Sequence, residues 1–305
     1  MNHTDHIAQE IAQGLLSPQP YISPKFFYDR LGSQLFSAIT AAAEYYIPAV
    51  EAQIMSAAIN DIAKRAGHGR VLIDIGAGDG RKAAALFDSL QPAAYVAIDI
   101  SKEHLDHSVS ALQREFPNLC ISGYACDFSR QFTLPDSLPS GPRMAFYPGS
   151  SIGNFSPDQA LTFLSQVRNT LADGGLLIGI DLVKDKAVLN AAYNDALGIT
   201  AAFNKNILLN VNRLIGANFS IQDFEHLAFF NATQSRIEMH LRALRDTTVQ
   251  WPGGALTLKQ GETIHTENSY KYTLSGLEQL LTQAGFLKTA VWTDPKRYFS
   301  VAWAE

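Results

Sequence analysis

The chain has 305 residues, of which 47% are hydrophobic and 17% are charged, and its formal net charge is -5. This length fits one large domain or two medium ones, and the composition excludes disordered and fibrous proteins. The mild acidity disfavours nucleic acid and anionic membranes as partners, and two cysteines cannot form a disulfide framework. Without a signal-peptide pattern or a bilayer-length apolar run, we expect a soluble, cytoplasmic protein.

The central part of the chain reads as strands that alternate with helices. Apolar residues recur at helical spacing after Ser101, which is placed as an N-cap. The alternation predicts an α/β fold, a parallel sheet with helices on both faces. The predicted strands are 71–75, 95–99, 121–125, 144–147 and 176–183, and the predicted helices are 82–90, one from 101, and 158–171.

Helical patterns at 26–62 and 186–217 interrupt this alternation. The order of these elements predicts a second, α+β domain that is assembled from two separated pieces. After the second interruption we predict strands at 226–242 and 263–272, a helix at 274–285, and a terminal strand pair at 286–293 and 298–303. The predicted boundaries are 49–184 plus 271–305 for the first domain and 9–48 plus 185–270 for the second.

A glycine-rich turn follows the first predicted strand, with the sequence Asp74-Ile-Gly76-Ala-Gly78-Asp-Gly80-Arg81-Lys82. A turn between a strand and a helix is the setting of a nucleotide site, although an ordinary turn can also have this sequence. The dinucleotide fingerprint would need glycine at Arg81. The spacing instead resembles motif I of class I S-adenosylmethionine (SAM) methyltransferases. Asp99, at the end of the next strand, is placed to accept hydrogen bonds from ribose hydroxyls.

Two more polar segments stand at strand ends, where open α/β folds bind their ligands. After the third strand, Asp127 offers an acid for an adenine amino group and Phe128 an aromatic wall, or the two simply end the strand. After the fourth strand, the segment from Gly149 to Asn154 contains two glycines, two serines and an amide. Asn154 is therefore a candidate for contact with the substrate.

Eight stretches, in order from about residue 20 to the C-terminus, are similar to one family. They begin with Phe27-Tyr28-Asp-Arg-Leu-Gly-Ser33 and Leu35-Phe36, continue with Glu44-Tyr45-Tyr46, Gly149-Ser-Ser-Ile-Gly-Asn154, Asp181-Leu-Val-Lys-Asp185 and Gly198-Ile-Thr-Ala-Ala-Phe-Asn204, and end with Arg236-Ile-Glu-Met239 and Thr266-Glu267-Asn-Ser269. They resemble the ergothioneine-pathway L-histidine Nα-methyltransferases. The resemblance implies a class I, Rossmann-like SAM domain joined to a substrate domain built from the N-terminal segment and an insertion.

The resemblance also implies roles for individual residues. The SAM contacts are Gly76, Gly78, Lys82, Asp99, Asp127 and Phe128. On the substrate, Asn154 and Tyr193 hold the carboxylate, Glu267 and Ser269 bind the imidazole, and Tyr28, Phe36, Tyr45, Gly149 and Met239 line the space around the amine and ring. Tyr28 and Tyr45 are the catalytic candidates, and no metal is expected. The chain departs from the family pattern at Asp74, Gly80-Arg81 and Asn268.

The residue types at Glu267 and Ser269 agree with an imidazole site. Two residues apart on a strand, they point to one face, and a carboxylate beside a hydroxyl can pair with both imidazole nitrogens. Such a pair would bind an aliphatic amino acid badly, because a buried acceptor without a partner costs about 1–3 kcal/mol. Read alone, the two residues also fit a solvated surface strand.

The sequence therefore predicts an enzyme that methylates the α-amine of L-histidine up to three times, as a monomer. The reaction needs a neutral amine, whose proton Tyr28 or a water would relay, while Tyr28, Phe36 and Tyr45 could face a methylated cation. Three alternatives stay open. They are the same fold acting on another aromatic amino acid or stopping at fewer methyls, a nicotinamide dehydrogenase, and a SAM-binding protein without catalysis.

Overall fold

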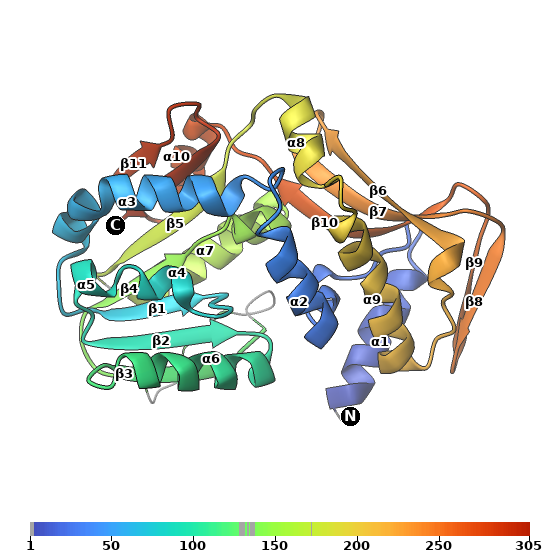
Figure 1. The fold of residues 1–305 in the computed structure, drawn as a ribbon, viewed down its shortest axis with the longest axis horizontal. Helices are drawn as coiled ribbons and strands as arrows, with labels where there is room; N and C mark the ends of the chain where they lie inside the picture. Colours follow the sequence, from blue (N-terminus) through green and yellow to red (C-terminus); the bar gives the residue numbers. More distant parts are fainter. Residues whose placement is uncertain (1–2, 128–131, 133, 135–137, 172) are drawn as a thin grey trace. The chain divides into compact units, whose positions relative to one another are not determined.

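The computed structural model describes the chain except residues 1–2, 128–131, 133, 135–137 and 172. The chain folds into two compact units (Figure 1). Unit 1 comprises Met1–Tyr46 and Asp185–Ser269, and unit 2 comprises Ile47–Lys184 and Tyr270–Glu305. Each unit is thus built from separated pieces of chain. Which ligand each unit binds stays a prediction.

Unit 2 contains a seven-stranded sheet with the order β11-β12-β5-β4-β1-β2-β3. Strands β1 to β5 pair in parallel, and β12 is antiparallel to both neighbours. This is a doubly wound sheet with an antiparallel edge, which confirms the predicted α/β, Rossmann-like fold class. The strands are β1 (Val71–Ile75), β2 (Ala94–Asp99), β3 (Cys120–Ala125), β4 (Arg143–Tyr147), β5 (Gly175–Asp181), β11 (Thr289–Thr293) and β12 (Phe299–Ala304).

Apolar runs explain the core of unit 2. Every residue of β5 and β12 is buried, as expected for strands covered on both faces. Phe163 and Leu164 of α7 and Leu277 of α10 pack into one cluster with alternate residues of β1, such as Ile73. The helices of unit 2 are α3 (Ile47–Ala66), α4 (Arg81–Ala84), α5 (Phe87–Leu90), α6 (Lys102–Glu115), the 3-10 helix η2 (Ser151–Asn154), α7 (Pro157–Leu171) and α10 (Leu274–Gln283).

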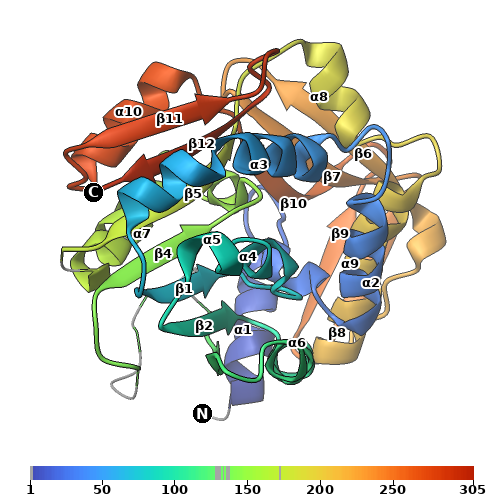
Figure 2. The same ribbon diagram turned by 60° about the vertical axis from the view of Figure 1, so that its left-hand side comes forward.

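Unit 1 places helices on a three-stranded sheet with the order β10-β7-β6. Helix α2 lies along α9 in both views (Figures 1 and 2), and the apolar faces of the helices share one core with the sheet. The helices are α1 (His3–Leu15), η1 (Pro24–Phe27), α2 (Arg30–Ile39), α8 (Lys186–Ala192), α9 (Ile199–Ile215) and η3 (Ile221–Asp223). The strands are β6 (Phe224–Asn231), β7 (Arg236–Ala243), β10 (Thr263–Tyr270) and the hairpin β8 (Thr247–Trp251) with β9 (Gly254–Leu258).

Several predicted elements are wrong in detail. The helix predicted at 186–217 is broken between α8 and α9, because the Asp195 carboxylate accepts hydrogen bonds from the N–H groups of Ile199 and Thr200 and starts a new helix. The strand predicted at 226–242 is the hairpin β6–β7, with a turn in which Ser235 has a φ of 51°. The helix predicted at 82–90 is two single turns, and the helical pattern at 26–62 covers the end of η1, all of α2 and most of α3.

Candidate active site

The glycine loop of unit 2 is shaped by its own backbone and by one carboxylate. Gly76, Gly78 and Gly80 have φ angles of 74°, 54° and 70°, a region that favours glycine. The N–H of Gly76 donates to the carbonyl of Ile98 at 2.8 Å. The two oxygens of Asp99 accept from the N–H groups of Gly78, at 2.9 Å, and Ser101, at 3.0 Å. Asp99 therefore fixes the loop and the start of α6 together.

Beneath this loop, Asp74 is buried at the end of β1. The Tyr95 hydroxyl donates to its Oδ2 atom at 2.8 Å. Burial outweighs this hydrogen bond and the nearby Lys82 charge and raises the pKa of Asp74 to about 7. A Cβ atom at Gly80 would lie 2.9 Å from the Tyr95 hydroxyl oxygen and 2.5 Å from Leu112. The third glycine is therefore required by packing as well as by φ.

Lys82, in the first turn of α4 after the glycine loop, is held by Glu51 of α3. The Lys82 Nζ atom lies 2.6 Å from Glu51 Oε2, and the Gly149 N–H donates to Glu51 Oε1 at 2.7 Å. A cavity of about 350 Å³ beside this pair is lined by apolar residues such as Met55 and Phe146. The sequence analysis missed Glu51. The available signal was an acidic residue in a helix whose nearby buried positions are apolar.

The turn after β4 is tied to the neighbouring strand β5. Ser150 has a φ of 59°, its N–H donates to the Gly179 carbonyl at 3.2 Å, and its Oγ atom accepts from the Asp181 N–H at 2.9 Å. This turn leads into η2, which ends at the half-buried Asn154. Asp127 is half-buried just after β3, while Phe128 lies outside the described residues. All predicted cofactor residues that are described thus belong to unit 2.

Unit 1 brings together predicted substrate residues that are far apart in the sequence. A row of aromatic rings runs from Tyr28 to Phe36, to Tyr45 and to Tyr193, with centroid separations of 5.7, 6.5 and 6.1 Å. At the end of the row, the Tyr193 hydroxyl donates to Ser269 Oγ at 2.8 Å. Both of these side chains are buried. The structure therefore joins the residue predicted for the carboxylate to one predicted for the imidazole.

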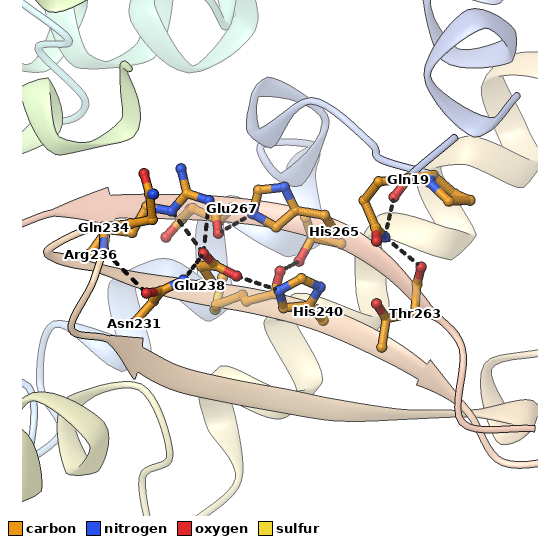
Figure 3. Close-up of polar contacts among 12 residues, drawn as sticks. Gln19, Asn231, Gln234, Arg236, Glu238, His240, Thr263, His265 and Glu267 are labelled. Atoms are coloured by element: carbon orange, nitrogen blue, oxygen red, sulfur yellow. Dashed lines mark hydrogen bonds and ion pairs between the residues drawn. The ribbon is translucent and has the colours of Figure 1, made fainter. Parts of the chain in front are cut away.

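Glu267 lies in β10 near a polar network that the sequence analysis did not single out (Figure 3). The His265 Nε2 atom contacts the Glu267 carbonyl at 3.0 Å, and the rings of His265 and His240 are 4.8 Å apart. His240 contacts Glu238 at 3.1 Å, and Arg236 Nε donates to the same carboxylate at 2.8 Å. The network therefore extends from the Glu267 carbonyl on β10 through His265 and His240 to Glu238 on β7.

The charges in this network follow from burial and hydrogen bonding. Burial lowers the pKa of His240 and of His265, so both rings are neutral near pH 7. For Glu238, burial opposes ionisation, but hydrogen bonds from Arg236, His240 and Asn231 outweigh it and lower its pKa. The network therefore contains an ion pair between Arg236 and Glu238, with two neutral imidazoles beside it.

Met239 differs from the other predicted substrate residues. Its side chain is buried in the hydrophobic core of unit 1, next to Leu241 and Ile264 in the cluster. Its carbonyl accepts a hydrogen bond from the Thr266 hydroxyl at 3.0 Å. Met239 therefore contributes to packing of β7 against β10, whatever it contacts in a substrate complex.

Over the part of the chain that the structure describes, His, Cys, Asp and Glu side chains form no group of three that could hold a metal ion. Among the helices with described residues, none combines the length and apolar character needed to cross a membrane.

Comparison with known proteins gives one family over nearly the whole chain. The sequence model of the family described as "Histidine-specific methyltransferase, SAM-dependent" matches residues 7–305. A histidine N-alpha-methyltransferase of Mycolicibacterium smegmatis is 36% identical, over 98% of this chain and 94% of the relative. Ergothioneine biosynthesis protein 1 of Neurospora crassa is 30% identical, over 89% of this chain and 32% of the relative.

Among solved structures, the magnesium protoporphyrin IX methyltransferase of Synechocystis superposes with a TM-score of 0.48 and 13% identity, covering 92% of this chain and 96% of that one. The family match confirms the resemblance found in the sequence and the predicted SAM dependence. The roles predicted for individual residues stay predictions.

Proposed function

The chain belongs to the SAM-dependent, histidine-specific methyltransferase family, and we propose that it methylates the α-amine of L-histidine three times. The product would be trimethylhistidine, also called hercynine, the precursor expected in an ergothioneine pathway. The observation that supports this proposal is the hydrogen bond between Tyr193 and Ser269, because it joins a residue proposed for the carboxylate to one proposed for the imidazole within one unit.

The residues of unit 2 fit SAM. Asp99 stands at the carboxyl end of β2 with its carboxylate oriented by two backbone donors, which suits ribose hydroxyls. Gly76 and Gly78 expose backbone to the ligand, and the half-exposed Lys82 ammonium suits the carboxylate of the methionine part. Asp127 and Phe128 are proposed for the adenine. When bound, SAM supplies a methyl group that is already activated on a sulfonium.

The residues proposed for histidine divide its recognition into two parts. When substrate binds, the single Tyr193 O–H is proposed to turn from Ser269 to the α-carboxylate, with Asn154 as a second neutral donor. Orientation would then rest on directional hydrogen bonds. Glu267 and Ser269 pair with the imidazole nitrogens, which rejects side chains that lack them. Phe36, Gly149 and Met239 complete the surroundings of the amine and ring.

The catalytic contribution of the chain is to position the amine and keep it neutral. An α-amino group has a pKa near 8 in peptides, and a low-dielectric site lowers that value, so no strong base is needed. Tyr28 and Tyr45 are proposed to relay the proton through their hydroxyls. Their rings, with that of Phe36, would then face the methylated ammonium.

A competition assay tests the substrate. The enzyme is incubated with SAM and all twenty amino acids, and products are identified by mass. We expect histidine alone to gain one, two and then three methyl groups. Methylation of another aromatic amino acid would change the substrate, and a single methyl at long times would change the number transferred. Absence of any product on histidine would refute the proposal.

Substitution of Glu267 tests the imidazole role. Glu267→Ala should raise the KM for histidine about 100-fold, because a charged hydrogen bond contributes about 1.5–3 kcal/mol, and should leave the affinity for S-adenosylhomocysteine unchanged. The matched control is Glu262→Ala, which removes an exposed carboxylate just before β10. Equal losses for both ligands would place Glu267 outside the histidine site.

The remaining alternatives predict different ligand responses. A dehydrogenase would be stabilised thermally by NAD, and a non-catalytic binder by SAM without turnover. We expect stabilisation by SAM and its demethylated product, together with turnover.

We propose the cytoplasm as the compartment, because Cys120 and Cys126 are both free thiols.

A further inference from the structure

Glu51 is a buried carboxylate that the roles given above leave unexplained. It lies in α3 with 2% of its surface exposed. Strand β5 makes room for it, because a Cβ atom at Gly179 would lie 2.0 Å from Glu51 Oε1. Burying a carboxylate is costly unless its oxygens are paired, so the partners of Glu51 are the reason to look further.

The first partner is Lys82. Its Nζ atom is 2.6 Å from Glu51 Oε2, yet 44% of the Lys82 side chain remains exposed, against 3% for Glu51. An ammonium group has three N–H donors, and this ion pair uses one of them. The pair therefore fixes the direction of a flexible side chain while leaving donors for a ligand carboxylate.

The second partner is the backbone of Gly149. Its N–H donates to Glu51 Oε1 at 2.7 Å, and its φ is 76°. A Cβ atom at Gly149 would lie 3.2 Å from Lys82 Nζ, so the ammonium packs against the bare glycine. Gly149 opens the turn that leads to Asn154, and Glu51 therefore sets the start of that turn.

We propose that Glu51 is a positioning residue for methyl transfer, which holds Lys82 toward the carboxylate of SAM with one oxygen and orients the Gly149–Asn154 turn toward histidine with the other. This inference rests on the proposed roles of Lys82 and Asn154. It adds a residue of unit 2 that contacts both a proposed cofactor residue, Lys82, and the turn that leads to a proposed substrate residue, Asn154. Lys82 and the Gly149 N–H contact different oxygens of Glu51, so substitutions can separate the effect on SAM binding from the effect on histidine binding.

Two substitutions separate them. Glu51→Gln keeps an oxygen acceptor for the Gly149 N–H but removes the charge that holds Lys82. We expect it to raise the KM for SAM and the Kd of S-adenosylhomocysteine about 10-fold, with the KM for histidine changed less than about 2-fold. Glu51→Met removes both interactions, and we expect the KM values for SAM and for histidine to rise together.

A merely structural role predicts another pattern. The melting temperature would then fall in the Gln variant while both KM values stay at the wild-type level, and this result would overturn the proposal. Tighter binding of S-adenosylhomocysteine by Glu51→Gln would also overturn it, because Glu51 would then compete for Lys82. The control is Glu10→Gln, which removes the partner of Lys25 in unit 1, 2.9 Å away, and should leave both KM values unchanged.

A double-mutant cycle with Lys82→Met distinguishes this inference from the proposed function. If Lys82→Met weakens S-adenosylhomocysteine binding and Glu51→Gln adds no further loss, Glu51 acts through Lys82. If Lys82→Met weakens binding and Glu51→Gln alone has no effect, Glu51 has no positioning role. If Lys82→Met leaves binding unchanged, the role proposed for Lys82 is wrong, and the inference falls with it.

Discussion

The glycine loop of unit 2 and the aromatic row of unit 1 are built in opposite ways. The loop is one short segment, Asp74 to Lys82, and its geometry rests on backbone N–H groups, positive φ angles and the carboxylate of Asp99 at the end of the next strand. The row draws single side chains from the end of η1, from α2, from the segment between α2 and α3, and from the α8–α9 connection, and it ends on Ser269 of β10. A backbone-built site tolerates few changes of residue, whereas a site built from side chains can change specificity one residue at a time.

The largest expected effect concerns the acid beneath the loop. The pKa of Asp74 is raised in the folded state, so between about pH 4 and 7 the folded protein holds a proton that the unfolded chain has lost, and stability falls as the pH rises. Relative to Asp74→Asn, the wild type should lose up to about 4 kcal/mol of unfolding free energy between pH 4 and 8.

Denaturant titrations across this pH range measure the difference. The control is Asp88→Asn, which removes an exposed carboxylate from α5 and should retain the wild-type pH dependence. If the unfolding free energies of the wild type and Asp74→Asn depended on pH in the same way, the pKa of Asp74 would not be raised in the folded protein.

The next effect compares two glycines of the loop. At Gly80 an added methyl group meets Leu112 and the Tyr95 hydroxyl, which Asp74 holds in place, so Gly80→Ala should cost about 3 kcal/mol of stability. Gly78 has open space around the same position, and Gly78→Ala should cost about 1 kcal/mol, from its φ alone. Chemical denaturation gives both values, and equal costs would mean that packing does not shape the loop.

A third prediction concerns the carboxylate that organises the loop. Asp99→Ala removes the acceptor of two backbone N–H groups and the proposed ribose partner, so affinity for S-adenosylhomocysteine should fall about 100-fold. Asp79→Ala removes an exposed loop carboxylate that accepts a hydrogen bond from the Arg81 N–H, and it should change affinity less than about 3-fold. Isothermal titration calorimetry measures both, and similar losses would contradict a special role for Asp99.

The smallest effect concerns the row built from side chains. Tyr193→Phe keeps the ring against Tyr45 but removes the hydroxyl that donates to Ser269, so the KM for histidine should rise about 10-fold with no change in S-adenosylhomocysteine affinity. Tyr21→Phe, at an exposed position, is the control. Steady-state kinetics and calorimetry test this. An equal loss of affinity for S-adenosylhomocysteine would show that the aromatic row does not act on histidine binding alone.

How far the sequence could predict the molecule depends on the range of the interactions involved. The strands of unit 2 and the glycine loop were predictable, because apolar runs and glycine spacing are local signals. The break between α8 and α9 was missed, since the helical pattern continues while the Asp195 carboxylate starts a new helix. The hairpin β6–β7 was missed because its turn lacks a glycine or proline signal.

Family resemblance supplied the candidate residues of unit 1, but it could not give their contacts. Tyr193 and Ser269 are 76 residues apart, and Glu51 is 31 residues from Lys82 and 98 from Gly149. By itself the sequence determined the fold class, the cofactor loop and the family, because each can be recognised from short stretches of neighbouring residues. Only the tertiary structure decided which carboxylate holds Lys82 and which hydroxyl meets Ser269, because each contact forms only when helices and strands that are far apart in the sequence pack together within its own unit.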